Sequence, residues 1–199
     1  MLKWQLLPLI QEGPNVILDL GCGAGQFGRA LQDMKKVSEI IGVEIHPQAA
    51  EEAAKYYTKV YQDNVESLSL PYEQYFDYVI CGDILEHLVD PWAMLLKINR
   101  MLKQGGSLIC SIPNIRYWKI ITELTLKGKW EYTDAGILDS THLRFFTKYS
   151  FIEMLNFAGY SVTWVWMSIH GKKAVVNKIT FELFSEFLAT QIMFSANKI

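Results

Sequence analysis

The stretch VILDLGCGAGQFG contains two overlapping glycine patterns. One is Gly21-x-Gly23-x-Gly25 with Asp19 two positions before it, and the other is G-x-G-x-x-G, which ends at Gly28. A glycine turn between a strand and a helix lets backbone approach a ligand, and the helix N-terminus favours negative charge. The second pattern is the usual fingerprint of a dinucleotide site. The glycines therefore predict an adenosine cofactor, either a nicotinamide or flavin dinucleotide or S-adenosylmethionine.

Three carboxylates near the ends of predicted strands support an adenosine cofactor, and two of them, Asp19 and Asp63, favour S-adenosylmethionine. Asp19 would oppose a pyrophosphate across a short, partly desolvated gap, whereas it would suit the α-ammonium or sulfonium group of S-adenosylmethionine. Glu44, 21 residues after Gly23, can accept hydrogen bonds from both ribose hydroxyls of either cofactor. Asp63 is placed to accept a hydrogen bond from an adenine amino group. We therefore predict that the loop binds S-adenosylmethionine.

Two of the four histidines are candidates for catalysis of methyl transfer. His87 lies in GDILEHL and His142 in GILDSTHLRFFT, whereas His46 is expected at the adenosine rim or in solvent and His170 in a turn. Alignment of acceptor and methyl group can supply about 7–11 kcal/mol. A base that takes a proton from a hydroxyl typically adds about 10²–10⁴-fold. Both are candidate bases, and His142 could instead bind the substrate; alternatively, His142 pairs with Arg144 in a structural role.

A metal site is a further interpretation of the same region. Asp83, Glu86 and His87 are spaced i, i+3 and i+4, which would place their side chains on one face of a helical turn. This donor set suits manganese or zinc better than magnesium, and His142 is a candidate fourth ligand. Alternatively, these residues only begin a helix beside the cofactor and bind no metal. This second interpretation is the main expectation.

The elements that position these residues alternate along the chain. Short apolar runs, NVILDL, EIIGVEI, KVYQDN, FDYVICGD and GSLICSIPN, are typical of buried parallel strands. Helices are predicted between them at 26–36, 47–56 and 91–103, with Pro47 and Pro91 in first turns and KQGG as a glycine stop. This alternation predicts βαβ units and an open sheet covered by helices on both faces.

The last third of the chain has a different pattern. A helical stretch, YWKIITELTLKGKW, and a polar loop precede a helix at 149–158, the strand YSVTWVWMSI, an apolar helix at about 175–188 and the strand TQIMFSANK. This late unit adds two strands to the predicted sheet. Because no repeat or linker-like stretch interrupts the chain, residues 1–199 are predicted to form one domain, with about 115–147 as a lid over the substrate.

At these motifs the chain resembles the class I S-adenosylmethionine-dependent methyltransferases, in particular the ubiquinone-pathway type and methyltransferase types 11 and 23. LDLGCGAGQFG is similar to their first motif, Glu44 in IGVEIHP to the second and Asp63 to the third, and the block from FDYVICGD to GGSLICSIPN is similar to their fourth and fifth strands. The match is dense over about 16–114. It implies an α/β fold: a Rossmann-like open, mostly parallel seven-stranded sheet with helices on both faces and an antiparallel last strand.

The resemblance also implies roles for individual residues. The glycine loop would line the methionine part of the cofactor, with Asp19 supporting its ammonium group, Glu44 holding the ribose and Asp63 the adenine. The implied cofactor-binding residues are Asp19, Gly21, Cys22, Gly23, Gly25, Glu44, Asp63, Asn64, Cys81 and Gly82. The cysteine thiols are expected to be small buried fillers rather than nucleophiles.

The resemblance extends to the candidate catalytic region. An acid-x-x-Glu-His cluster similar to GDILEH occurs in small-RNA 2′-O-methyltransferases and ubiquinone-pathway O-methyltransferases, which use a divalent metal; this sequence differs by having Asp83 in the first position. A DxTHLRFFT segment is loosely similar to methyltransferases of sugar and cell-envelope gene neighbourhoods. The resemblance therefore implies a small-molecule acceptor methylated on an oxygen, such as a sugar, a phenol or a related metabolite.

Composition limits the partners and the compartment. The net charge of −2 gives no argument for a nucleic-acid partner, and none is expected. Three widely spaced cysteines without a C-x-x-C motif favour a reducing compartment, and a cytoplasmic location is expected. No apolar run approaches the roughly 20 residues of a membrane span, so stable membrane insertion is not expected. The oligomeric state stays open.

The sequence is also compatible with two other functions and with one other site. A nicotinamide-dependent oxidoreductase could use the overlapping G-x-G-x-x-G, but no tyrosine of the chain has lysine four positions on, the YxxxK pattern of short-chain dehydrogenases. A non-catalytic partner subunit would be expected to lack a cofactor motif, and none is missing. Four aromatic residues either pack on the sheet, wall an acceptor pocket or contact a membrane surface: Tyr117, Trp118, Trp130 and Tyr132.

Overall fold

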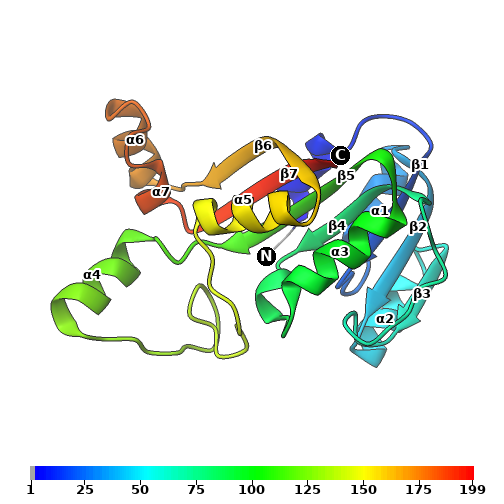
Figure 1. Ribbon diagram of the computed structural model, residues 1–199, viewed down its shortest axis with the longest axis horizontal. Coiled ribbons are helices and arrows are strands. Elements are labelled where there is room, and N and C mark those ends of the chain that lie inside the picture. The colour runs from blue at the N-terminus through cyan, green and yellow to red at the C-terminus, as the bar shows by residue number, and fades with distance from the viewer. Residues whose placement is uncertain (1–2) are drawn as a thin grey trace.

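The apolar runs form the strands of one seven-stranded sheet in the computed structural model, which describes residues 3–199 (Figure 1). The strands occur in the spatial order β3-β2-β1-β4-β5-β7-β6. Only β7 runs antiparallel to its neighbours, β5 and β6. The predicted seven-stranded sheet with an antiparallel last strand is therefore confirmed. The strands are β1 (Asn15–Leu20), β2 (Val37–Glu44), β3 (Lys59–Gln62), β4 (Phe76–Gly82), β5 (Leu102–Pro113), β6 (Tyr160–Ser168) and β7 (Gln191–Lys198).

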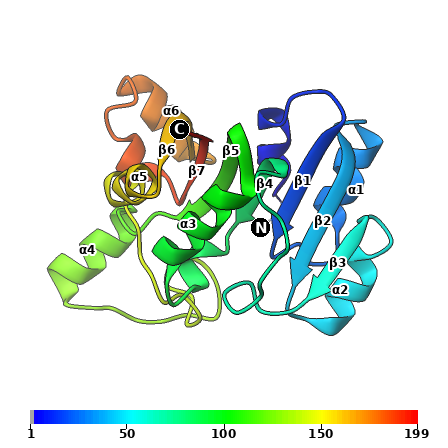
Figure 2. The same ribbon diagram turned by 45° about the vertical axis from the view of Figure 1, so that its right-hand side comes forward.

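Helices cover both faces of the sheet, as the alternating sequence predicted. On one face, α1, α2 and the 3-10 helix η1 pack around Ile17, Ile40 and Ile80. On the other face, α3 and α5 pack around Leu18, Val79 and Leu108 (Figures 1 and 2). The helices are η1 (Lys3–Leu9), α1 (Gln26–Asp33), α2 (Pro47–Ala53), the 3-10 helix η2 (Leu85–His87), α3 (Pro91–Met101), α4 (Trp118–Lys127), α5 (Lys148–Phe157), α6 (Lys172–Ile179) and α7 (Ser185–Leu188).

Two predicted elements differ from the structure. KQGG does not follow α3 as a simple stop, because β5 begins at Leu102 and pairs with β4 through a register shift. The single helix expected at 175–188 is two short helices, α6 and α7. Phe181 and Glu182 between them have φ angles of 49° and 62°, a left-handed conformation that cannot continue a right-handed helix.

The strand order reverses direction between β1 and β4. From β1 the chain builds outward through β2 to β3, and from β4 it builds the other way through β5 (Figure 2). In such sheets the loops at the carboxyl ends diverge at the reversal point and leave a crevice for a ligand. The glycine loop, Glu44 and Asp83 all lie at the carboxyl ends of strands that end at this crevice.

Residues 115–147 leave the sheet after β5 and return to it before α5. Helix α4 in this segment has no buried residue, and Figure 1 shows it extending away from the sheet. The segment closes where Ile115 N donates to Phe146 O at 3.1 Å. Its role as a lid over the substrate stays a prediction. Among the described residues, no helix is both long and apolar enough to cross a membrane.

Candidate active site

The crevice contains a cavity of about 470 Å³ at the carboxyl ends of β1, β2, β3 and β4. Several predicted cofactor residues come together there, although the glycine loop contributes only its first member to the wall. His46, which was expected at the adenosine rim or in solvent, also lines the cavity, as do Ile84 and Glu66, which were not predicted. The lining residues are Gly21, Val43, Glu44, Ile45, His46, Asp63, Asn64, Val65, Glu66, Asp83, Ile84, His87, Leu88 and Thr141.

Glu44 connects the glycine loop to the end of β2. Its Oε2 accepts a hydrogen bond from Gly23 N at 2.8 Å, and its Oε1 accepts one from His46 N at 2.9 Å. The side chain is buried in the cavity wall. Because each carboxylate oxygen can accept more than one hydrogen bond, Glu44 retains capacity for a ribose hydroxyl while it holds the loop.

Asp19 lies beneath the glycine loop rather than on the cavity surface. Its side chain is fully buried, and its Oδ2 accepts a hydrogen bond from the Tyr57 hydroxyl at 2.6 Å. Burial, together with the negative charge and hydrogen bonding of Asp19, raises the pKa of Tyr57, so the phenol is a donor at neutral pH. Sequence reasoning missed Tyr57 because it is 38 residues from Asp19 and belongs to no motif.

Gly28, the third glycine of the G-x-G-x-x-G pattern, packs directly against the ring of Tyr57. A Cβ atom at Gly28 would lie 2.3 Å from Tyr57 Cε2, so only glycine lets α1 approach the ring so closely. Gly42 and Gly25 crowd the same ring, with Cβ positions 2.9 Å and 3.2 Å from its atoms. The overlapping pattern therefore reflects the packing of Tyr57 and does not itself require a dinucleotide.

The remaining predicted cofactor residues divide between the cavity wall and the core. Asp63 and Asn64 line the cavity, and Asn64 N donates to Asp63 Oδ1 at 2.7 Å. Cys22 and Cys81 are buried within the hydrophobic core clusters. Cys81 and Gly82 are not lining residues; the wall after β4 is formed instead by the next two residues, Asp83 and Ile84.

A second cavity, of about 300 Å³, adjoins the first beneath the 128–147 loop. The two cavities share Asp83 and His87, so a ligand in one lies against the same side chains as a ligand in the other. We call it the acceptor cavity. It is lined by Asp83, Glu86, His87, Pro113, Ala135, Gly136, Ile137, Asp139, His142, Thr190 and Gln191.

Glu86, His87 and His142 converge in the wall of the acceptor cavity. One ligand atom of each lies within 4.8 Å of those of the other two, and the two imidazole rings meet edge to face at 4.7 Å. Both Glu86 carboxylate oxygens are buried and accept no hydrogen bond. Burial, with a smaller contribution from Asp83, raises the pKa of Glu86 well above its usual value. A buried carboxylate without a donor creates a strong demand for a proton or a cation.

Hydrogen bonds fix both imidazoles in the same tautomer. His87 Nδ1 lies 3.2 Å from Thr141 O and 3.1 Å from Thr141 Oγ1. The Thr141 hydroxyl donates to Asp139 Oδ1 at 2.6 Å, so its oxygen accepts from His87. His142 Nδ1 lies 3.0 Å from the carbonyl of Ile137. Since carbonyls only accept, both Nδ1 atoms carry hydrogen, and in the neutral form of either ring the lone pair is therefore on Nε2.

The electrostatics of His87 agree with a neutral ring. Burial, followed by the proximity of His142, lowers the pKa of His87 below its usual value. The loop that carries His142 is held against this region, because Leu143 N and Arg144 N both donate to the Glu86 carbonyl, at 2.9 Å and 3.0 Å. The three side chains are thus positioned by backbone contacts from both segments.

Asp83 does not join this group, which corrects the predicted Asp83, Glu86 and His87 cluster. Asp83 has a φ angle of 54° and precedes the 3-10 helix η2, so the three residues do not share one helical face. Its Oδ1 accepts from Ser111 Oγ at 2.8 Å and from the side-chain amide of Gln191. Among the described residues, the group whose geometry could hold a metal ion is Glu86, His87 and His142.

The residues present fit a divalent transition metal. Two imidazole Nε2 lone pairs and one carboxylate are a common donor set for zinc, manganese or iron, whereas magnesium prefers oxygen ligands. The tautomer-fixing contacts of Thr141 and Ile137 are of the kind that orient metal-bound histidines. The inference that Glu86 needs a nearby positive charge depends on its burial in this structure and not on similarity to other proteins.

The aromatic residues of the 115–147 segment do not wall the acceptor cavity. None of Tyr117, Trp118, Trp130 and Tyr132 is among the described residues that line it. Trp130 packs edge to face on Phe145 at 5.2 Å, and Trp118 and Tyr132 are exposed. Sequence reasoning instead missed Gln191 and Thr190, which reach the cavity from the start of β7 because that strand runs antiparallel.

Comparison with known proteins assigns the chain to a protein family. A family model described as a methyltransferase domain matches residues 3–165, which is most of the chain. The chain belongs to the class I S-adenosylmethionine-dependent methyltransferases. S-adenosylmethionine is therefore its cofactor, and the expected resemblance, the enzyme class and the cofactor are confirmed. The nicotinamide alternative is not supported.

Individual curated relatives share low sequence identity with the chain. The chain is 30% identical over 112 residues to a ubiquinone biosynthesis O-methyltransferase of Cereibacter sphaeroides strain ATCC 17029, covering 54% of this chain and 44% of that protein. It is 26% identical over 191 residues to the protein of the same name from strain KD131, covering 87% of this chain and 74% of that protein. The chain spans less than half the length of the first curated relatives it matches.

Solved structures share the fold over nearly the whole chain. An S-adenosylmethionine-dependent methyltransferase of Archaeoglobus fulgidus has a TM-score of 0.71 at 18% identity, covering 98% of this chain and 91% of that one. Another, from Mesorhizobium loti, has a TM-score of 0.70 at 17% identity, with 98% and 97% coverage. At these identities the likeness establishes the fold alone.

Proposed function

We propose that the methyltransferase acts on a hydroxyl group of a small molecule bound in the acceptor cavity, with Glu86, His87 and His142 holding a divalent transition metal beside it. The observation that carries this proposal is the convergence of one ring nitrogen from each of two imidazoles on a buried carboxylate that has no hydrogen-bond donor. A bound divalent cation lowers the pKa of a hydroxyl that it coordinates. The name of the curated relatives, O-methyltransferase, supports the choice of oxygen.

The residues of the chain itself would orient the acceptor for methyl transfer. Asp139 and Thr141 hold His87 through its Nδ1 atom, and Ile137 holds His142 in the same way, which would leave the Nε2 atom of each ring for the metal. Asp83, fixed by Ser111 and Gln191, lies where the two cavities meet. In-line methyl transfer needs this alignment more than any covalent step by the protein, and alignment can supply about 7–11 kcal/mol.

The cofactor would lie with its adenosine along Glu44, Asp63 and Asn64. Glu44 would accept from the ribose hydroxyls while it holds Gly23 N, and Asp63 would accept from the adenine amino group. The methionine part would then reach past Gly21, whose Cβ position is already within 2.6 Å of Ile84 Cδ1. Asp19 would act from below the loop, through its charge and its bond to Tyr57.

Transfer of a labelled methyl group tests the reaction. Purified protein is incubated with methyl-labelled S-adenosylmethionine and matched acceptors that carry a hydroxyl or an amine on the same phenol, catechol or sugar framework. We expect label on hydroxyl acceptors only, loss of turnover after chelation and recovery with zinc or manganese. Transfer to the amine series would contradict the choice of oxygen. Chelator-resistant transfer would favour the metal-free alternative, in which His142 Nε2 is the base.

Metal binding itself has a readout that needs no acceptor. Calorimetric titration with zinc and manganese should show one site per chain that is lost in Glu86→Gln and in His142→Gln. Asp83→Asn is the matched control, because Asp83 is an acid of the same cavity outside the ligand group, and it should retain the site. Equal metal affinity in Glu86→Gln and the unsubstituted protein would exclude the proposed ligand set.

A further inference from the structure

The α6–α7 hairpin displays large apolar side chains to solvent at its tip. Phe181 is 94% exposed, Leu183 78% and Ile179 70%. Such a concentration of exposed apolar surface on a small segment marks an interaction site more often than an ordinary surface. Neither the cofactor cavity nor the acceptor cavity includes any of these three residues.

The tip is held in this conformation by its own hydrogen bonds. Glu182 N donates to Asn177 O at 2.8 Å, Phe181 N donates to Lys178 O at 3.2 Å, and Ser185 Oγ donates to Asn177 Oδ1 at 3.1 Å. The left-handed φ angles of Phe181 and Glu182 are unfavourable for side chains of this size. Strained residues persist where the surrounding contacts over-determine them, so the outward display of Phe181 is a built feature of the turn.

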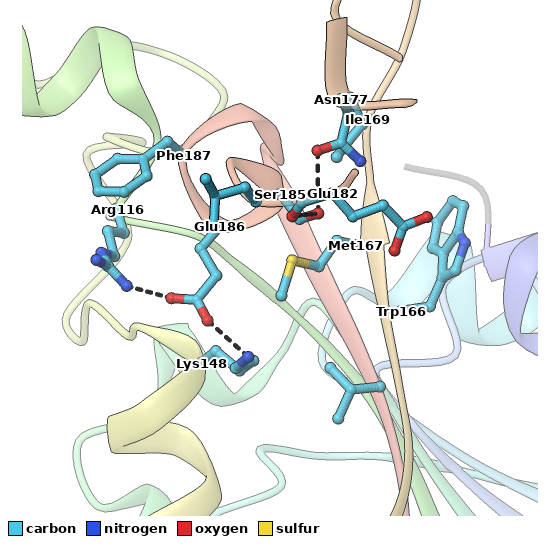
Figure 3. A pocket seen from close by; sticks show the side chains of 12 residues that line it. Arg116, Lys148, Trp166, Met167, Ile169, Asn177, Glu182, Ser185, Glu186 and Phe187 are labelled. Carbon is cyan, nitrogen blue, oxygen red and sulfur yellow. Dashed lines mark hydrogen bonds and ion pairs between the residues drawn. The ribbon is translucent and has the colours of Figure 1, made fainter. Parts of the chain in front are cut away.

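The base of the hairpin is anchored, as Figure 3 shows. Glu186 binds both Lys148, at 2.6 Å, and Arg116, and its pKa is lowered by these cations, chiefly by the hydrogen bond from Lys148. Asn114 Nδ2 donates to the carbonyls of Glu186 and Ala189, at 2.7 Å and 2.9 Å. A firm base beneath an apolar tip gives the hairpin a fixed direction.

Helix α4 extends the same surface. Both views show α4 and the α6–α7 hairpin at the same end of the molecule, opposite β3 (Figures 1 and 2). Lys173 Nζ donates to the Tyr117 hydroxyl and so links the two segments. On α4, Leu126 is 81% exposed and Trp118 is 44% exposed. We call the exposed residues of α4 and the hairpin tip the apolar end.

The charge of the chain is divided between this end and the rest. Residues 115–131 and 170–188 together contain seven Lys or Arg and four Asp or Glu, a net charge of +3. Because the whole chain carries −2, the remaining residues carry −5. Lys172 and Lys178 flank the exposed side chains of α6, and Lys127 adjoins Leu126. Cations beside protruding Phe and Leu side chains are typical of segments that lie in a membrane interface.

From this combination we infer that the apolar end docks on the surface of an anionic lipid bilayer. Phe181, Leu183 and Ile179 enter the interface, and the neighbouring lysines contact lipid phosphates. A protein partner would need a separate pocket for each protruding side chain, whereas a bilayer accepts them in any register. The acidic remainder of the chain would be repelled by the same surface. This repulsion would orient the molecule with its apolar end toward the bilayer. This inference does not depend on the proposed function.

Vesicle co-sedimentation of the full chain tests the inference. We expect binding to vesicles of phosphatidylglycerol and phosphatidylcholine in equal parts, weaker binding to phosphatidylcholine alone, and weakening by salt. The double variant Phe181→Ser, Leu183→Ser should lose binding by at least about tenfold. Lys172→Glu with Lys178→Glu should lose it by a similar factor. Met34→Ser, which removes an apolar side chain that is 48% exposed just beyond α1, should bind like the unsubstituted protein.

Binding of S-adenosylhomocysteine to each variant shows that it is folded, because none of these residues lines a cavity of the active site. Three results would overturn the inference. One is no sedimentation of the unsubstituted chain with anionic vesicles, and another is equal binding to both kinds of vesicle. The third is a dimer in sedimentation velocity that dissociates in the Phe181, Leu183 variant, which would assign the apolar end to a second copy of the chain.

Discussion

The Tyr57 hydroxyl donates a 2.6 Å hydrogen bond to Asp19, a fully buried carboxylate at the end of β1. Tyr57 reaches it through a gap that exists because Gly28 and Gly42 have no side chain. The ring therefore couples α1, β1 and β2 at the point where the glycine loop begins. We propose that Tyr57 acts on the cofactor through Asp19 and the glycine loop, as a positioning residue.

Substitution Tyr57→Phe should weaken cofactor binding without unfolding the protein. It removes one donor to a buried carboxylate, and a hydrogen bond to a charged group contributes about 1.5–3 kcal/mol. We expect the Kd of S-adenosylhomocysteine, measured by calorimetry, to rise about tenfold or more. Tyr56→Phe, at the half-buried neighbouring tyrosine, is the matched control and should leave the Kd unchanged. A lower Tm with an unchanged Kd would show that Tyr57 only supports the fold.

Substitution Gly28→Ala should destabilise the protein even though alanine favours helix. The new Cβ would lie 2.3 Å from Tyr57 Cε2. Helix propensity would gain about 1 kcal/mol, whereas overpacking costs about 1–3 kcal/mol, so we expect a net loss of up to about 2 kcal/mol in urea unfolding. The loss should become a gain in a Tyr57→Ala background, where the clash is absent. Strict additivity of the two substitutions would contradict this account.

Local sequence patterns were sufficient for the sheet and for part of the cofactor site. The run NVILDL corresponds to β1 residue for residue, because a buried parallel strand needs continuous apolar residues and ends at a glycine turn. Glu44 was found from its spacing to the glycines and lies in the cavity wall. These features depend on neighbours in sequence or on one βαβ unit, which is the range over which periodicity and spacing carry information.

The acceptor cavity depends on contacts between distant segments of the chain. Less of it could therefore be predicted from the sequence. Glu86 and His142 are brought together only because residues 128–147 fold back and bond to the Glu86 carbonyl. The positive φ of Asp83 removed it from the predicted cluster, and nothing in GDILEHL signals that angle. Gln191 reaches Asp83 from 108 residues away across the sheet. None of these relationships has a local pattern.

Substitution Thr141→Val should weaken metal binding at the Glu86, His87 and His142 group. The hydroxyl connects Asp139 Oδ1 to His87 Nδ1, at 2.6 Å and 3.1 Å, and so helps to keep the Nε2 lone pair directed at the site. Loss of such supporting contacts typically lowers metal affinity about 10–100-fold. We expect the zinc Kd to rise about tenfold by calorimetry, and ¹⁵N resonances of the His87 ring to show a mixture of tautomers.

Thr163→Val on β6 is the control for Thr141→Val, since its hydroxyl donates to Ser195 O far from the site. It should change neither the zinc Kd nor the histidine resonances. An unchanged His87 tautomer in Thr141→Val would mean that the Thr141 carbonyl, 3.2 Å from Nδ1, suffices to fix the ring.

Substitution Glu86→Gln should remove a pH dependence from the stability of the metal-free protein. Burial, and then the charge of Asp83, raises the pKa of Glu86 in the folded state. A raised carboxyl pKa means that folding favours the protonated form, so the stability contributed is present below the unfolded pKa of about 4.3 and is lost as pH rises through the folded value. In a chelator, the free energy of unfolding of Glu86→Gln relative to the unsubstituted protein should therefore increase from acid to neutral pH.

Saturating zinc should reverse this order at neutral pH, because a bound cation stabilises the Glu86 protein and the amide variant loses that ligand. Urea unfolding at a series of pH values, with chelator or with metal, measures both effects. Glu73→Gln, at an exposed glutamate, should follow the unsubstituted protein in both conditions. Parallel pH profiles for Glu86→Gln and the unsubstituted protein in chelator would show that Glu86 acquires a donor in solution, and the demand for a cation at this site would disappear with it.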